Sequence, residues 1–378
     1  MTVGKRLTQP LAWLVWVTVP EDARPMITMA DVARVAGVST STVSHVVNGT
    51  RRVTQETERA VREAIQATGY THDRIARSLA TGRTRTIGLA MSAISNPYFA
   101  ELAHAIEREA ALAGYTLLLA DTHDEPEREL RATRDLLGRR VDGVLLAPSA
   151  EPTAALELLR KRAVPTVLID RFVPVELDQI ATENVAPTAR LVEHLSELGH
   201  ERIGMIAGLK GLATSEERIE GYRRGLASSS LRFDPELVVR GDSDAEHARA
   251  AVHRVLRLGQ PPTALVVTNN RMTIGAMQAL REAGLTVPDE IALVAFDDFE
   301  WADLFHPRLT TIAQATTQLG EQSVAMLLSR LANPDLLARK VRLEPIFVHR
   351  ESCGCRGGPT EPLAAASAEP RVPAVGEG

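Results

Sequence analysis

The sequence predicts an α/β protein in which a small three-helix domain with a helix-turn-helix precedes two doubly wound parallel-sheet subdomains. Three short helical segments come first, with a glycine between the first two. From residue 86 onward, apolar runs rich in β-branched residues or leucine alternate with helical stretches. The length of 378 residues exceeds what one ordinary core holds, so two or three domains are expected.

The three-helix domain is expected over residues 27–71. Thr28 and Asp31 have the spacing of a capping box, which starts the first helix. Gly37 allows a tight turn, and Ser39 can cap the second helix. The side chains expected to face inward are Val32, Ala33, Val35 and Ala36, then Val43, Val46 and Val47, then Ala60, Val61, Ala64 and Ile65.

The body is expected over residues 86–352. Runs such as "TIGLAMS", "VPTVLID" and "IALVAFDD" are continuously apolar, and helical stretches separate them. Such runs are typical of parallel strands that are buried on both faces. Seven of them fit two subdomains, and the chain is expected to cross between these near residue 183, at 299–315 and at 333–341.

The remaining segments have few side chains that could pack into a hydrophobic core. Residues 72–85 are expected to form a hinge that becomes helical only when supported, because its apolar side chains are few. Residues 1–26 resemble a signal peptide but lack a small-residue cleavage site, so we expect a disordered extension or a mis-assigned start. Residues 353–378 have no periodicity, and we expect a disordered tail.

The charge is distributed unevenly along the chain. Residues 27–86 hold nine arginines and five carboxylates, which give this segment a net charge of +4. Because the net charge of the whole chain is −5, the rest of the chain carries −9. A basic module on an acidic body is typical of proteins that bind nucleic acid through one domain. Five small hydroxyl side chains in "STSTVS" (39–44) would let the second helix lie close to an acceptor-rich surface such as DNA.

The order of motifs resembles the LacI/GalR family of transcriptional regulators over roughly residues 27–352. The series comprises "DVARVAGVSTSTVSHVVNG", "ARSLATGRTRTIGL", "SNPYFAEL", "LGHERIGMIAG", "RIEGYRRGL" and "VAFDDFEWADLFHPRLTTIAQ", and it ends on "RES". This resemblance implies a DNA-binding repressor, with a body like that of periplasmic solute-binding proteins. It also implies a homodimer on palindromic operator DNA.

The resemblance implies which residues read DNA. Base contacts are expected from Thr40, Ser41 and His45. Leu79 is expected to wedge into a central base step and kink the DNA, with Arg77 near the minor groove. The other residues expected at the DNA are Thr28, Met29, Ser44, Asn48, Arg52, Thr54, Thr57, Tyr70, Asp73, Ala76 and Ala80. The family usually has Pro-Asn where this chain has His72 and Asp73.

The body is expected to bind a small-molecule effector, a sugar or sugar derivative, beyond the carboxyl ends of its strands. Arg218 and Asp297 match family positions that bind effector hydroxyls, and the pairing of a guanidinium with a carboxylate suits a polyol. The full expected set is Ser92, Tyr98, Phe99, Asp121, Ser149, Asp170, Arg218, Asn269 and Asp297. Asn270 departs from the usual Asp of the family. Family members include both induced and co-repressed repressors; here we expect a repressor of carbohydrate-related genes that its effector releases.

Other functions fit less well. A solute-binding transport protein would share the body, but it needs an export signal and no DNA module. A sugar-processing enzyme would need catalytic groups, and no nucleophile–base grouping or phosphate-binding motif is present. His349, Cys353 and Cys355 lack a fourth ligand and border the tail, so neither a metal site nor a cofactor is expected. The two cysteines suggest no disulfide framework, and with no other membrane-length segment a cytoplasmic protein is expected.

Overall fold

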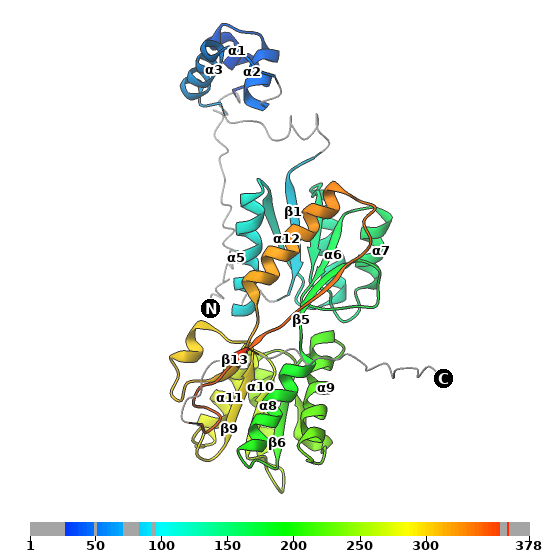
Figure 1. Cartoon of the computed structure of the whole chain (residues 1–378), viewed down its shortest axis with the longest axis vertical. Coiled ribbons are helices and arrows are strands. Elements are labelled where there is room, and N and C mark those ends of the chain that lie inside the picture. Colours follow the sequence, from blue (N-terminus) through cyan, green and yellow to red (C-terminus); the bar gives the residue numbers. More distant parts are fainter. Residues whose placement is uncertain (1–26, 49–50, 71–82, 93–95, 356–360, 363–378) are drawn as a thin grey trace, which may run out of the picture. The chain divides into compact units, whose positions relative to one another are not determined.

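The computed structural model describes residues 27–48, 51–70, 83–92, 96–355 and 361–362. The chain divides into two compact units at residues 80 and 81. The first contains helices α1 to α3, and the second contains both parallel sheets (Figure 1). Among the described residues, no helix is long and apolar enough to cross a membrane.

The helical unit consists of α1 (Met29–Ala36), α2 (Thr40–Asn48) and α3 (Gln55–Thr68). The capping box is confirmed, since Thr28 and Asp31 each accept a hydrogen bond from the other's backbone N–H. Gly37 ends α1 with φ at +65°, a backbone conformation that glycine adopts without strain. The core contains Val32, Ala33, Val43, Val61, Ala64 and Tyr70.

One predicted core residue of this unit is wrong. Val35 is 54% exposed, whereas Val32 and Ala33 are buried. A helix of eight residues has little more than two turns, and the adjacent Val32 and Ala33 already fill the face that α2 and α3 cover. Val35 therefore points to solvent.

The first sheet of the second unit has the strand order β11-β5-β4-β3-β1-β2, and its strands pair in parallel. Leu89 of β1 packs in the core below α5 and α12, and its neighbour Ala90 packs on the opposite face, below α6 and α7. Both faces are therefore buried, as the apolar runs predict. The elements are β1 (Thr86–Met91), α5 (Pro97–Leu112), β2 (Thr116–Asp121), α6 (Pro126–Gly138), β3 (Gly143–Leu146), α7 (Thr153–Lys161), β4 (Thr166–Ile169), β5 (Asp178–Thr182), α12 (Thr316–Ala332) and β11 (Lys340–Leu343).

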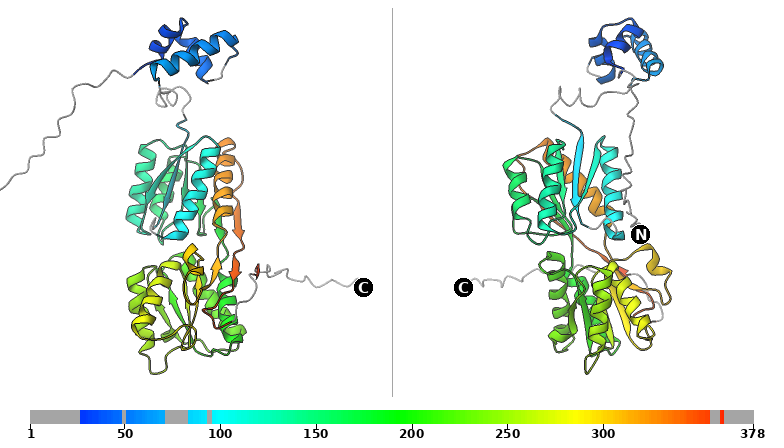
Figure 2. Two further views of the ribbon diagram at one scale, coloured as in Figure 1. Left: turned by 90° about the vertical axis from the view of Figure 1, so that its left-hand side faces the viewer. Right: turned by 180° about the vertical axis from the view of Figure 1, so that it is seen from behind.

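The second sheet has the order β13-β12-β10-β9-β8-β6-β7, and only β12 and β13 run antiparallel to their neighbours. Figure 2 shows its helices on both faces. The elements are α8 (Val185–Glu197), β6 (Ile203–Ala207), α9 (Ala213–Ser228), η1 (Pro235–Leu237), β7 (Val238–Arg240), α10 (Ala245–Leu256), β8 (Ala264–Val267), α11 (Asn270–Glu282), β9 (Ala292–Phe296), η2 (Glu300–Asp303), β10 (Thr310–Ala313), β12 (Ile346–Val348) and β13 (Glu361–Pro362).

Within residues 96–355, the chain passes between the sheets three times. It leaves β5 for α8 at 183–184 and leaves β10 for α12 at 314–315, which agrees with the first two expected crossings. The third crossing is at 344–345 rather than 333–341, because β11 still pairs with β5 of the first sheet. Lys340 and Arg342 place positive charges at alternate positions of β11, and these charges make the edge strand resemble a linker in the sequence.

The predicted tail also begins too early. Cys353 is fully buried in the core of the second sheet, and residues 361–362 pair with β12. The hydroxyl of Ser352 donates to the carbonyl of Leu293 at 2.6 Å, which ties this segment to β9. Residues 356–360 and 363–378, and the extension 1–26, lie outside the described residues.

Candidate ligand cleft and nucleic-acid interface

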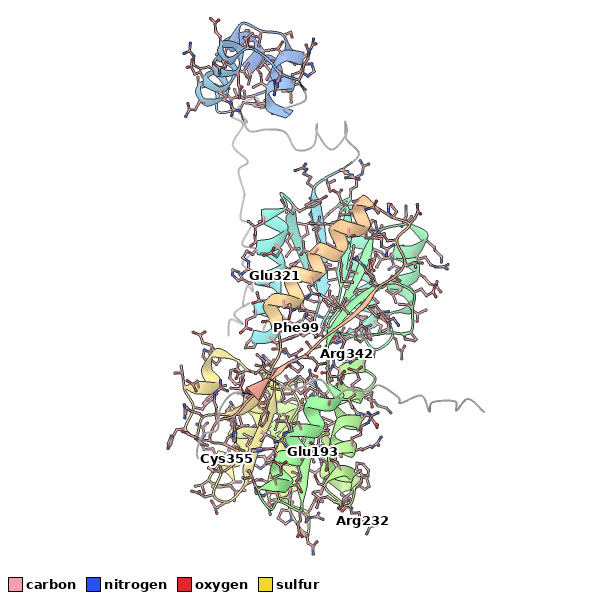
Figure 3. The ribbon with its side chains drawn as sticks, viewed as in Figure 1. Phe99, Glu193, Arg232, Glu321, Arg342 and Cys355 are labelled. Carbon is pink, nitrogen blue, oxygen red and sulfur yellow. The ribbon has the colours of Figure 1, made fainter. Side chains whose placement is uncertain are left out.

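A cleft of about 310 Å³ lies between the carboxyl ends of the two parallel sheets of the second unit. This volume is at the lower end of the range for small-molecule sites. Figure 3 shows Phe99 at the end of the first subdomain that faces the second. Of the nine residues expected to bind an effector, seven line the cleft: Ser92, Tyr98, Phe99, Asp170, Arg218, Asn269 and Asp297.

Asp170 and Asp297 occupy equivalent places in the two subdomains. Asp170 directly follows β4, Asp297 directly follows β9, and their φ angles are +70° and +71°. Aspartate tolerates this left-handed conformation better than most residues, but it remains sparsely populated. Both carboxylates are buried at the wall of the cleft, one from each sheet.

Each aspartate is held by a neighbour. The hydroxyl of Tyr98 donates to Asp170 Oδ1 at 2.6 Å, and Gln314 Nε2 donates to Asp297 Oδ1 at 2.6 Å. Burial raises the pKa of Tyr98 well above its usual value, and the nearby Asp170 raises it further, so the phenol stays protonated and donates. Burial also raises the pKa of Asp297, while Arg218 opposes this shift.

Arg218 reaches the cleft from α9. Its Nε donates to Asn184 Oδ1 at 2.9 Å, and its Nη1 donates to the carbonyl oxygen of Thr268. The guanidinium lies 3.7 Å from the ring centroid of Phe296, and Nη2 lies 3.8 Å from Asp297 Oδ1. The planar group is thereby fixed, with Asp297 near enough to bind the same ligand.

The sequence did not single out Arg171, Asp124 or Gln314, although all three line the cleft. Arg171 is buried and forms ion pairs with Asp124 and, at 3.1 Å, with Asp170. Burial lowers the pKa of Arg171, but the two carboxylates outweigh burial and raise it overall. Two of these could be found from the sequence, since Arg171 directly follows Asp170 and Gln314 ends the motif "RLTTIAQ".

Asp121 and Ser149 do not line the cleft. The hydroxyl of Ser149 donates to Glu129 Oε1 at 3.1 Å, and its N–H donates to the other carboxylate oxygen, so α6 occupies this strand end. Asp121 Oδ1 accepts the N–H of His123 at 2.9 Å. Asp121 ends β2 and Ser149 follows β3, as predicted, but other protein groups bind their polar atoms.

In the helical unit, the hydroxyls of "STST" (39–42) gather at the start of α2. Ser39 Oγ accepts the N–H of Thr42 at 3.1 Å and lies 2.7 Å from Ser41 Oγ, so it acts as the expected cap. Thr40 and Ser41 are exposed, and Ser44 and His45 are half-buried. α2 therefore presents small hydroxyls on one side while Val43 packs inward.

The other residues expected at DNA fall into three groups. Thr54 caps α3, and its hydroxyl oxygen lies 2.8 Å from that of Thr57. Arg52, two residues before Thr54, is exposed. Met29 packs partly against the core and Tyr70 is buried in it, so Tyr70 belongs to the frame of the unit. The side chain of Asn48 lies outside the described part, as do Asp73, Ala76, Arg77, Leu79 and Ala80.

A cluster of two histidines and two cysteines lies beside the second sheet. His194, His349, Cys353 and Cys355 place their ligand atoms within 4.8 Å of one another. The reason given above for excluding a metal site, the absence of a fourth ligand, is therefore wrong. His194 comes from α8, far along the chain from the other three, and no local motif marks it.

Two family models match the chain. One, described as bacterial regulatory proteins of the lacI family, matches residues 28–73. The other, described as a periplasmic binding protein-like domain, matches residues 192–353.

Curated relatives and solved structures are similar over most of the length. The HTH-type transcriptional repressor PurR of Haemophilus influenzae strain PittEE is 36% identical over 311 residues, which are 82% of this chain and 93% of that protein. The Lac repressor dimer bound to operator and the anti-inducer ONPF has a TM-score of 0.78 and 29% identity over 86% of this chain and 99% of its own. The CelR–cellobiose complex has a TM-score of 0.66 and 28% identity, with the same two coverages.

Proposed function

The chain belongs to the LacI family of bacterial regulatory proteins and is a DNA-binding transcriptional repressor with an effector-binding body; we propose that it binds palindromic operator DNA as a homodimer and that a sugar or sugar derivative in its cleft releases it. Its relatives are repressors rather than enzymes, and we place it in the cytoplasm, where bacterial DNA lies.

The effector class rests on the two buried aspartates at the cleft. Carboxylates from both sheets and the fixed guanidinium of Arg218 converge on one space of about 310 Å³. A carboxylate accepts from ligand hydroxyls and a guanidinium donates to them, so this set matches a neutral polyhydroxylated molecule. Such a molecule leaves no ligand charge unpaired in a buried site.

The DNA contacts proposed here follow the exposed side of α2. Thr40, Ser41 and His45 read base edges, while Arg52 and the start of α3 contact phosphates. Leu79 and its neighbours 73–80, which lie outside the described residues, kink the operator at its centre. Two copies of the helical unit then match two half-sites, as operator symmetry requires.

Gel-shift titration tests this proposal directly. The full-length protein is titrated on its own promoter fragment with and without a panel of sugars, sugar phosphates and purine bases. We expect a specific complex that neutral sugars dissociate. Release by a purine base alone, or tighter binding with a sugar, would contradict the proposed effector class or its sign, while failure to bind any promoter fragment would contradict the proposed operator.

A further inference from the structure

The cluster of two histidines and two cysteines lies in the second subdomain, and nothing in the proposed repression mechanism uses it. We propose that His194, His349, Cys353 and Cys355 bind one Zn²⁺ ion that fixes the end of the chain to α8. Figure 3 shows Cys355 in this subdomain.

The distances suit tetrahedral coordination. Zinc–nitrogen bonds of about 2.0–2.1 Å and zinc–sulfur bonds of about 2.3 Å place neighbouring ligand atoms roughly 3.3–3.8 Å apart. Cys355 Sγ lies 3.8 Å from His194 Nε2, and all four ligand atoms lie within 4.8 Å of one another. Small side-chain rotations close the remaining difference.

Three segments bring the ligands together. His194 is in the last part of α8, and His349 directly follows β12. The two cysteines flank Gly354, whose φ of +96° is open to glycine but strained for other residues. This tight turn directs both sulfurs toward the histidines. The backbone conformation therefore explains the glycine of the motif Cys-Gly-Cys, and metal binding explains its two cysteines.

The surroundings are those of a protected site. Cys353 is fully buried and His194 is 6% exposed. The ring of Phe347 lies 5.4 Å from that of His194 and stacks at 5.7 Å on that of His349, which keeps water from one side. The hydroxyl of Thr310 donates to Cys353 Sγ at 3.3 Å, a contact that orients this sulfur.

A carboxylate lies near one of the histidine ligands, beyond hydrogen-bond distance. Nε2 of His194 faces Cys355, and Nδ1 lies 4.0 Å from Glu197 Oε2. Glu197 is in turn paired with Arg190 at 2.7 Å. A histidine that binds a metal through one nitrogen commonly donates the other N–H to a carboxylate, which fixes the tautomer and the ring.

The ligand types select the metal and its role. Thiolate and imidazole are soft or borderline ligands, which favour zinc over magnesium or calcium. Four protein ligands leave no position for water or substrate, as in structural rather than catalytic sites. The ion would cross-link the segment after β12 to α8, so it contributes to the stability of the second subdomain.

Metal analysis of the untagged full-length protein tests the proposal. We expect about one zinc per chain after purification without chelators, and below 0.1 per chain in Cys353→Ser, Cys355→Ser and His194→Gln. The control His247→Gln changes an exposed histidine elsewhere in the subdomain and should keep the metal. Cobalt added to chelator-treated wild-type protein should give the absorption bands of a tetrahedral thiolate site.

A second measurement needs no variant. Removing zinc from the wild-type protein should lower its thermal midpoint by about 5–10 °C, and adding zinc back should restore it. A metal-free wild-type protein with no thiolate–cobalt band and no shift overturns the proposal. A zinc content in the two Cys→Ser variants equal to that of the wild-type protein overturns it as well, as does a Cys353–Cys355 disulfide in protein purified under reductant.

Discussion

Asp142 holds the backbone at Thr84, where the chain enters the first sheet. The N–H of Thr84 donates to Asp142 Oδ1 at 2.8 Å, its hydroxyl donates to the same oxygen at 3.0 Å, and the N–H of Arg85 donates to Oδ2 at 2.9 Å. One carboxylate thus anchors Thr84 and Arg85, the last two residues of the segment expected to form the hinge. In the proposed mechanism, this anchored segment connects the first sheet, which carries half of the cleft, to the expected hinge.

Asp142→Ala should weaken the response of DNA binding to the effector. The three hydrogen bonds involve a charged acceptor, and their loss lets Thr84 and Arg85 move independently of β1. We expect the ratio of operator Kd with and without effector to fall about tenfold, within the usual range of coupling, while effector Kd stays unchanged. Anisotropy on labelled operator and calorimetry of effector binding measure the two quantities. Asp135→Ala removes an exposed carboxylate from the nearby α6 and should change neither.

The cleft prediction uses substitutions that keep the backbone. Asp170→Asn and Asp297→Asn remove one charge each, and asparagine tolerates the φ angles near +70° found at these positions. Loss of a charged acceptor should weaken effector binding about 10- to 100-fold and leave operator binding without effector intact. Calorimetry and gel shifts provide the two readouts, with the exposed Asp289→Asn as control. If the Asp297 variant released operator at the wild-type effector concentration, the cleft assignment would fail.

Periodicity and caps predicted the elements whose stability is local. The capping box at Thr28, the cap at Ser39 and the apolar strands β1 and β9 each depend on residues close together in the sequence. The strand ends then predicted four of the seven cleft residues, because parallel strands bring their carboxyl ends to one edge: Ser92, Asp170, Asn269 and Asp297. The other three, Tyr98, Phe99 and Arg218, lie on helices. Ser149 does not line the cleft, because its hydroxyl and N–H donate to Glu129 of another element, α6.

Contacts between distant segments escaped the sequence. β11 is an edge strand with charged residues at alternate positions, and only its pairing with β5 distinguishes it from a linker. The buried Cys353 looked like part of a disordered tail, because the sequence after it is low in complexity. His194 could not be joined to Cys355 without the packing of α8 against the sheet, since helical spacing alone predicts only a buried face.

Substitutions in the helical unit should separate phosphate binding from base recognition. Arg51 and Arg52 are exposed between α2 and α3, and alanine at either position should weaken binding to all DNA sequences and lower the salt slope by about one unit per lost phosphate contact. Thr40→Ala and His45→Ala should instead change which operator bases are preferred. Anisotropy titrations at several salt concentrations, on operator and on single-base variants, distinguish the two. Equal loss on every sequence for all four variants would contradict the assignment.

The capping box of α1 should make the helical unit sensitive to acid. Backbone and side-chain hydrogen bonds from Thr28, and then Arg34, lower the pKa of Asp31 to about 2. A carboxylate whose pKa is lowered on folding stabilises the fold fully above its unfolded value, near 4, and loses this effect as pH falls toward 2. Hydrogen exchange of residues 27–48 should therefore show less protection in Asp31→Asn than in wild type at pH 6, with the gap shrinking between pH 4 and 2.

The matched substitution for this experiment is Glu63→Gln on α3, whose carboxylate forms a long ion pair of 3.9 Å with Arg59. It should leave the protection of α1 unchanged at every pH. A gap between Asp31→Asn and wild type that stays constant down to pH 2 would show that shape, and not charge, accounts for the contribution of Asp31.

Arg342 connects the crossover strand β11 to the second subdomain. Its Nη1 pairs with Glu183 at 3.0 Å and its Nη2 with Glu217 of α9 at 3.2 Å, and Glu217 accepts from Asn184 at 2.8 Å. Asn184 also accepts from Arg218 at the cleft, so a chain of contacts links the effector site to the crossovers. Figure 3 shows Arg342 where the two subdomains meet.

Arg342→Gln and Glu217→Gln should each change effector Kd, because each loosens the same link between the subdomains. Their effects should be non-additive by about 0.5–1 kcal/mol, since the pair is partly exposed and solvent screens it. Calorimetry on both single variants and the double variant measures this coupling. Arg108 and Glu321 form a 2.8 Å pair between α5 and α12 within one subdomain, at similar exposure. Breaking that pair should leave effector Kd unchanged, and additive effects at Arg342 and Glu217 would mean that their contact does not govern the relation between the subdomains.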